Sequence, residues 1–106
     1  MSEWIDVAAS ADLGPGTVRT VDVDEVQVAV FNVDGELYAI EDQCTHDFFC
    51  LSEGELEGEE VVCPLHGARF DLRTGEATAP PAYESVITYA VRVEDEVVQV
   101  RDERDD

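Results

Sequence analysis

The chain has 106 residues, 44% of them hydrophobic, which suits one domain with a buried core and leaves little room for two. Its 26 acidic residues outnumber six basic ones, and the net charge of −20 argues against nucleic acid as a partner, because a polyanion would be repelled. No apolar run approaches the roughly 18 residues of a membrane-spanning helix, so we expect no membrane contact.

The acidity itself has three explanations that composition leaves open. It could match a partner with a basic docking face, or it could serve solubility in general. A salt-rich cell interior is the third explanation, since all six basic residues are arginine and lysine is absent.

The N-terminus and the cysteines predict a compartment. The first four residues form neither the basic nor the apolar part of a secretory signal. The cysteines, Cys44, Cys50 and Cys63, are odd in number and do not resemble a secreted disulfide framework. We therefore expect a cytoplasmic protein whose cysteines serve as ligands.

The first part of the chain reads as β-strands, because β-branched residues are frequent and apolar residues alternate with polar ones. Asp34-Gly35 predicts a tight hairpin, since glycine tolerates the positive φ of a primed turn. The expected strands are residues 4–8, 17–23, 26–33 and 36–41.

The middle and the end continue the β pattern with an interruption. Residues 43–72 have short apolar runs and gather the ligand-type side chains. The prolines at 80 and 81 exclude a helix there, because they lack amide donors. The expected strands are residues 60–63, 69–72, 86–94 and 97–101, followed by a solvated end.

No window has a helical period. Several short strands between turn signals predict an all-β fold, an antiparallel sandwich or barrel that carries a ligand-bearing insertion in its middle.

The insertion holds two short motifs, Cys44-Thr45-His46 and, sixteen residues later, Cys63-Pro64-Leu65-His66. Each offers one thiolate and one imidazole. The two loops could meet at one site if a hairpin separates them, and Gly54 and Gly58 allow such a hairpin.

Two metal centres compete for this donor set. A tetrahedral zinc ion accepts two cysteines and two histidines, as in a structural interaction module. Zinc fingers usually pair like with like in each half, however. A mixed pair in each loop suits a two-iron cluster better, with the cysteines on one iron and the histidines on the other.

The sequence resembles the Rieske ferredoxins of bacterial ring-hydroxylating dioxygenase systems. The resemblance rests on Cys44-Thr45-His46, on Leu51-Ser52-Glu53-Gly54 and on the run from Cys63 to Gly75, and it extends over nearly the whole chain. It implies a single Rieske domain, residues 1–106, in which a cluster-binding subdomain of about residues 43–72 stands at the tip of the β base.

The resemblance also implies roles for the ligands of one 2Fe–2S cluster per chain. Cys44 and Cys63 would hold the inner iron, and His46 and His66 the outer iron, with an imidazole edge near solvent where electrons pass.

Three departures from respiratory Rieske proteins matter. Leu65 stands where those proteins have a second-loop cysteine, so Cys50 has no disulfide partner, and we expect it to be a small buried filler. Phe48 and Phe49 are expected to shield the cluster, pack on the base or contact a partner.

The third departure concerns hydroxyl groups. Ala68 and Phe70 occupy the places of a serine and a tyrosine that donate to cluster sulfur. Without these donors, and with the acidic run at residues 53–60, we expect a reduction potential near the low end of the Rieske range, about −150 mV.

The sequence thus predicts a monomeric electron carrier and not an enzyme. It would take electrons from a flavin-containing ferredoxin reductase and pass them to a terminal oxygenase. The alternatives are the small subunit of a nitrite reductase-like complex and the structural zinc module.

Overall fold

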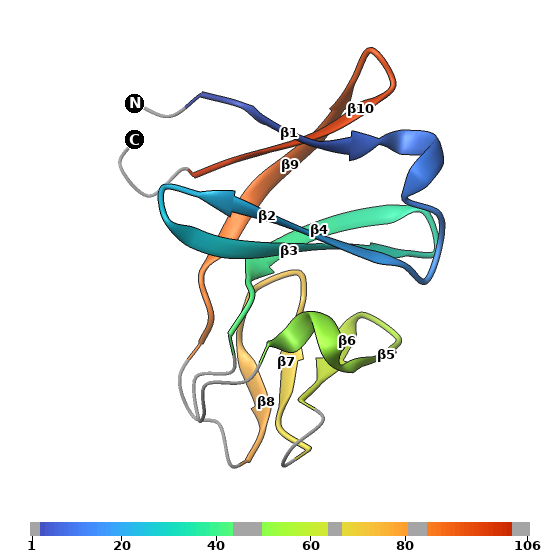
Figure 1. Cartoon of the computed structure of the whole chain (residues 1–106). Helices are drawn as coiled ribbons and strands as arrows, with labels where there is room; N and C mark the ends of the chain where they lie inside the picture. The colour runs from blue at the N-terminus through green and yellow to red at the C-terminus, as the bar shows by residue number, and fades with distance from the viewer. Residues whose placement is uncertain (1–2, 44–49, 64–66, 81–84, 103–106) are drawn as a thin grey trace.

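The computed structural model describes residues 3–43, 50–63, 67–80 and 85–102. Its larger sheet is antiparallel and six-stranded, in the order β1-β10-β9-β4-β3-β2 (Figure 1). The edge strands β1 and β2 contact each other, so the sheet nearly closes into a barrel. Its strands are β1 (Ile5–Ala9), β2 (Val18–Val23), β3 (Val26–Val33), β4 (Glu36–Glu41), β9 (Thr88–Glu94) and β10 (Val97–Arg101).

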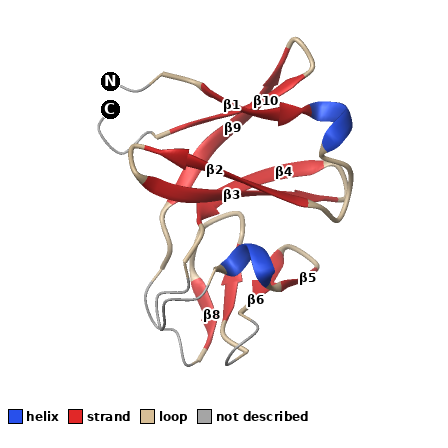
Figure 2. Cartoon of the chain, viewed as in Figure 1, coloured by secondary structure: helices blue, strands red, loops and turns tan. Residues whose placement is uncertain are grey.

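A smaller four-stranded sheet lies at one end of the larger one, below it in Figure 1. Its strands are β5 (Glu55–Glu57), β6 (Glu60–Val62), β7 (Arg69–Asp71) and β8 (Ala77–Ala79). Two short 3-10 helices, η1 (Ser10–Asp12) and η2 (Leu51–Glu53), complete the described structure (Figure 2). No helix in the described part of the chain is long and apolar enough to cross a membrane.

The all-β prediction is confirmed, and strands β3, β4 and β10 have the expected bounds. Two strands were missed, β5 and β8, and both are three residues long. Their sequences, Glu-Leu-Glu and Ala-Thr-Ala, are too short to show an alternation. The two 3-10 helices were also not predicted. They have three residues each, too few to create a helical period.

Strand β3 is buried on both of its faces. Val28 and Val30 pack into the interior of the near-barrel with residues such as Leu13 and Val100. Ala29 and Phe31, which alternate with them, face the opposite way. The strand therefore reads as an apolar run rather than as a half-buried alternation.

The second face of β3 is covered by the small sheet. Phe31 and Ile40 of the large sheet share one core with Val61 and Phe70 of the small sheet. All four side chains are at most 1% exposed. Because a single core joins the two sheets, the position of the small sheet is set by packing against the base.

Gly75 lies where the small sheet meets the segment that leads into β9. Its N–H donates to the Asp71 carbonyl, and its own carbonyl accepts from the Val86 N–H at 2.8 Å. A side chain at Gly75 would collide with the Val86 carbonyl, and the φ of +79° is left-handed. This close approach ties the end of the small sheet to the segment that leads into β9.

Acidic residues occupy the left-handed positions of three hairpins. Asp34 has φ of +52° and is followed by Gly35, as the primed turn predicts. The hairpins β2–β3 and β9–β10 instead place Asp24-Glu25 and Asp95-Glu96 at positive φ, between 50° and 70°. A non-glycine residue there costs about 1–2 kcal/mol.

We expect Glu25→Gly and Glu96→Gly each to raise the free energy of unfolding by about 0.5–1 kcal/mol. The relief of left-handed strain exceeds the entropy that glycine adds to the unfolded chain, about 0.4–1 kcal/mol. Denaturant unfolding followed by Trp4 fluorescence measures the change.

The matched control is Glu94→Gly, which removes the same charge from an exposed strand position. It should lower the free energy of unfolding, since glycine weakens a strand. Destabilisation by both turn variants would show that the acidic side chains hold these turns together, contrary to the strain argument.

Candidate metal centre

One of the four predicted ligands, Cys63, lies within the described residues. It directly follows β6, its side chain is 1% exposed, and it is not in a disulfide. The other three, Cys44, His46 and His66, lie outside the described residues, as do Phe48 and Phe49. The proposed ligand set therefore stays a prediction, to be weighed from the structure around it.

The second ligand loop is closed by the backbone of the β6–β7 hairpin. The Cys63 N–H donates to the Ala68 carbonyl at 2.7 Å, and the Gly67 N–H donates to the Cys63 carbonyl at 3.0 Å. Gly67 has φ of +75°, which glycine adopts without strain. These two hydrogen bonds hold Cys63 next to Gly67 and Ala68, the described residues at the other end of the loop.

The described side chains that pack with Cys63 in the core are apolar. Cys63 packs in the shared core with Ala68, Phe70 and Leu51, each of them fully buried. Neither Ala68 nor Phe70 carries a hydroxyl, so neither side chain can donate a hydrogen bond to sulfur. A buried thiol at the mouth of a closed turn fits a metal-bound thiolate that is shielded from solvent.

The first ligand loop leaves β4 and returns at Cys50. At its exit, Asp42 is 5% exposed, and its carboxylate accepts hydrogen bonds from Ser52 and Gln27. Asp42 and Gln27 were not singled out from the sequence, and Ser52 appeared only within a segment that carried the family resemblance, without a role of its own. The signals available were only an aspartate two residues before the first ligand and a serine just beyond Cys50.

Cys50 itself is half-buried, whereas a small buried filler was expected. Its Sγ lies 3.8 Å from Gln27 Nε2, which donates to it. Burial raises the pKa of the Cys50 thiol, and the nearby Asp42 and Glu53 carboxylates add to the rise. The thiol is therefore disfavoured as a thiolate.

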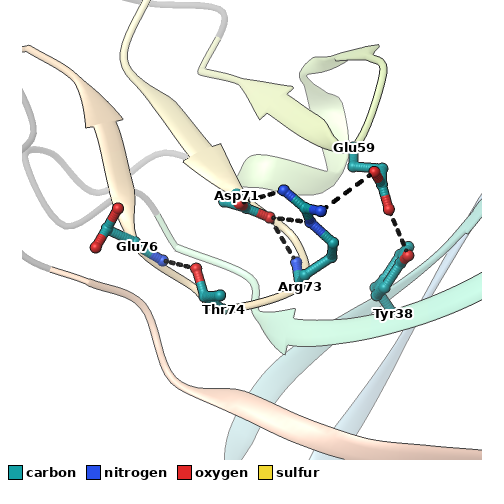
Figure 3. Close-up of polar contacts among 6 residues, drawn as sticks. All are labelled: Tyr38, Glu59, Asp71, Arg73, Thr74 and Glu76. Atoms are coloured by element: carbon teal, nitrogen blue, oxygen red, sulfur yellow. Dashed lines mark hydrogen bonds and ion pairs between the residues drawn. The ribbon is translucent and has the colours of Figure 1, made fainter.

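A polar network joins the two sheets beside this core (Figure 3). The Tyr38 hydroxyl, on β4, donates to Glu59 at 2.7 Å, and Arg73 lies 3.6 Å from the same carboxylate. Arg73 also donates to both oxygens of Asp71, at 3.2 and 3.1 Å. The bond to Glu59 raises the pKa of Tyr38, and the guanidinium lowers the pKa of Asp71.

The acidic run at residues 53–60 is partly neutralised, which weakens one part of the low-potential argument. Arg69 pairs with Glu57 at 2.8 Å and with Glu60 at 3.4 Å. Glu53 and Glu55 instead line a hollow of about 340 Å³ that also borders Cys63. Within this run, Glu53 and Glu55 are therefore the carboxylates that border Cys63.

The described residues alone do not gather a metal site: no group of three or more His, Cys, Asp or Glu side chains among them could hold an ion. The surroundings nevertheless fit a thiolate- and imidazole-bound cluster. A buried Cys63 begins a hairpin turn whose sequence continues to His66, and the first loop is anchored at both ends next to the same core.

Comparison with known proteins identifies the family. The model of the Rieske [2Fe-2S] domain matches residues 3–90. The chain belongs to the Rieske family. The two Cys/His motifs therefore do not form a structural zinc module. The cofactor of this Rieske protein is a 2Fe–2S cluster.

Several relatives of this Rieske protein are ferredoxin components of dioxygenase systems. It is 41% identical to the ferredoxin component of the naphthalene 1,2-dioxygenase system of Pseudomonas putida, over 87% of this chain and 88% of that protein. A chain in the structure of the complex of reduced oxygenase and oxidized ferredoxin in carbazole 1,9a-dioxygenase superposes with a TM-score of 0.87. That match is 39% identical and covers 92% of this chain and 91% of the other.

A second class of protein shares the fold at lower identity. The structure of a putative NADH-dependent nitrite reductase small subunit from Mycobacterium tuberculosis matches with a TM-score of 0.84 and 27% identity. It covers 95% of this chain and 96% of that one. The ferredoxin relatives are more similar in sequence, and this chain spans nearly their whole length. The Rieske protein is therefore an electron carrier of the ferredoxin type, as the sequence predicted.

We expect Ala68→Ser and Phe70→Tyr each to raise the reduction potential, because a hydroxyl that reaches a cluster sulfur favours the reduced, more negative form. Both positions are fully buried in the core that contains Cys63. Protein-film voltammetry of each variant measures the shift.

Phe31→Tyr is the matched control, because Phe31 is equally buried in that core but lies on β3. It should leave the potential unchanged. If neither Ala68→Ser nor Phe70→Tyr shifts the reduction potential more than Phe31→Tyr does, missing hydroxyl donors do not explain a low potential.

Proposed function

We propose that this chain is the ferredoxin of a ring-hydroxylating oxygenase system, and that it carries single electrons from a flavin-containing reductase to a terminal oxygenase. The observation that carries the proposal is the similarity, along nearly its full length, to ferredoxin components of dioxygenase systems. We propose further that it acts in the cytoplasm as a monomer of one domain, with a cluster-binding subdomain at about residues 43–72.

Cys44, His46, Cys63 and His66 are proposed as the ligands. The burial of Cys63 at the start of a closed turn supports its part in the set. The spacing of the remaining three in the sequence supports theirs. When bound, the cluster supplies one-electron chemistry, and the chain supplies burial, fixed loops and docking surface.

The small subunit of a nitrite reductase-like complex is the second candidate, favoured by the likeness to such a subunit in fold. A permanent subunit would copurify with its enzyme through an apolar interface. Among the described residues, Val93 is the large hydrophobic residue that is clearly exposed. A surface with so little exposed apolar area among the described residues favours a carrier that binds its partners transiently.

The ligand proposal is tested by replacing cysteines one at a time. Cys44→Ser should lose the cluster, whereas the wild-type chain should hold about two irons and two acid-labile sulfides. Iron and sulfide analysis of the purified proteins measures both.

Cys50→Ser is the matched control, since it makes the same change in the same loop and should keep full cluster content. Loss of iron in Cys50→Ser with retention in Cys44→Ser would reverse the assignment. His46→Cys and His66→Cys should lower the potential of any cluster they retain, because a thiolate adds negative charge.

The electron-transfer proposal makes a salt-dependent prediction. If the reductase presents a basic face, its rate of reducing this protein should fall steeply as potassium chloride is added. Salt shortens the screening length from about 10 Å at 0.1 M to about 3 Å at 1 M, and screening slows an electrostatically steered encounter. Stopped-flow reduction measures the rate.

Stability of the carrier should move the other way, because salt also screens the repulsion within a chain of charge −20. A rate that is flat or rising with salt would rule out electrostatic docking and would point to apolar contacts, with Phe48 and Phe49 as the residues to replace.

A further inference from the structure

The two ends of the first ligand loop are joined through one buried carboxylate. Asp42 Oδ1 accepts from the backbone N–H of Ser52 at 2.6 Å, and Asp42 Oδ2 accepts from the Ser52 hydroxyl at 2.7 Å. Gln27 on β3 donates its Nε2–H to the same Oδ2 at 2.6 Å. The Asp42 backbone N–H in turn donates to the Gln27 carbonyl at 2.8 Å. Asp42, Ser52 and Gln27 are called the Asp42 clamp below.

The clamp does for the first loop what the hairpin backbone does for the second. Cys63 and Ala68 are joined by backbone hydrogen bonding that continues the β6–β7 ladder. Asp42 follows β4, and Ser52 lies in η2, so these two residues belong to elements that share no strand ladder. A side chain must therefore supply the link that the backbone supplies elsewhere.

Burial makes the clamp specific. Asp42 is 5% exposed, and the described partners of its carboxylate are neutral donors rather than a cation. A buried carboxylate that accepts hydrogen bonds is held in one geometry, since moving away would leave it unsatisfied. Cys50, the residue at the N-cap of η2, makes no side-chain cap, and the Asp42 carboxylate instead accepts from an N–H of that helix.

We propose that Asp42 is a positioning residue for the cluster: through Ser52 and Gln27 it joins the two ends of the segment that contains Cys44 and His46, and so helps to keep both ligands in place. The inference rests on the proposed ligand set. Asp42 does not touch the cluster in this role, because it acts through the two ends of the loop.

A purely structural role is the competing explanation. If Asp42 only stabilised the fold, its removal would lower the unfolding midpoint without changing how firmly the folded protein holds iron. A positioning role changes iron retention and the spectrum of the reduced cluster in protein that is still folded. The two roles are thus separable by experiment.

The test is a series of holo-protein variants treated with an excess of an iron chelator. Asp42→Ala should release iron about 10- to 100-fold faster than wild type, the range usual for loss of a group that orients a metal ligand. Its reduced-state EPR lines should broaden as the ligands sample several positions. Trp4 fluorescence verifies that each variant is folded under the conditions used.

Asp42→Asn is the conservative variant. Its Oδ1 can still accept from the Ser52 N–H, and its amide can donate to the Ser52 hydroxyl and to a rotated Gln27 amide. Iron retention should therefore return close to the wild-type value. Release from Asp42→Asn as fast as from Asp42→Ala would overturn the hydrogen-bonded clamp.

Ser52→Ala provides a second test of the proposal if Asp42→Ala does not fold. It deletes one of the bonds to Asp42 and leaves the backbone bond, so iron release should quicken by a smaller factor. The matched controls are Asp12→Ala and Ser10→Ala, which make the same changes in η1. Variants of the clamp that release iron no faster than these controls would overturn the proposal.

Failure of the two proposals is distinguishable. Wild-type protein without iron and sulfide would contradict the proposed function. Wild-type protein with a full cluster, together with Asp42→Ala of unchanged iron retention and EPR spectrum, would contradict the positioning role alone.

Discussion

The burial of β3 on both faces is the constraint on which the rest of the structure depends. One face completes the interior of the near-barrel, and the other, with Phe31 at its centre, forms the floor on which the small sheet packs. A small sheet of four short strands buries too little surface to stand alone. It is stable here because Phe31 and Ile40 extend its core, so the base supports the sheet whose strand β6 leads into Cys63.

This arrangement explains why the two ligand loops are closed in different ways. The second loop is a connection within one hairpin, and ladder hydrogen bonds hold Cys63 in place as a by-product of strand pairing. The first loop connects the large sheet to the small one. Its ends lie on elements that do not pair, so a buried Asp42 joins them. Loop closure by a side chain is less redundant than closure by a ladder, because a single substitution removes it.

The sequence predicted those features that depend on local chemistry. Each of these features can be recognised from a short stretch of sequence: the apolar run 26–33, the Asp34-Gly35 turn and the two ligand motifs. The features it missed are of two kinds. β5 and β8 are too short to show an alternation, although their partners β6 and β7 are close in the chain. Asp42 is buried by contacts with Ser52 and Gln27, which lie in other elements and which no local pattern indicates. Three of the four predicted ligands lie outside the described residues, so their assignment still rests on the sequence motif alone.

Two arginine residues balance part of the negative charge locally. Arg69 lies on β7 and Arg73 in the turn that follows it, and their guanidinium groups contact Glu57, Glu59, Glu60 and Asp71 of the strands and turns of the small sheet. They therefore neutralise acidic residues at the end of the molecule that holds the ligand loops, and Tyr38 extends the network to the base. Pairs that are more than a third exposed contribute little to stability, so a local balance of charge is the better explanation for them. With much of the acidic run balanced in this way, Ala68 and Phe70 are the stronger reason to expect a low potential, because these two buried side chains offer no hydroxyl donor to sulfur whatever the salt concentration.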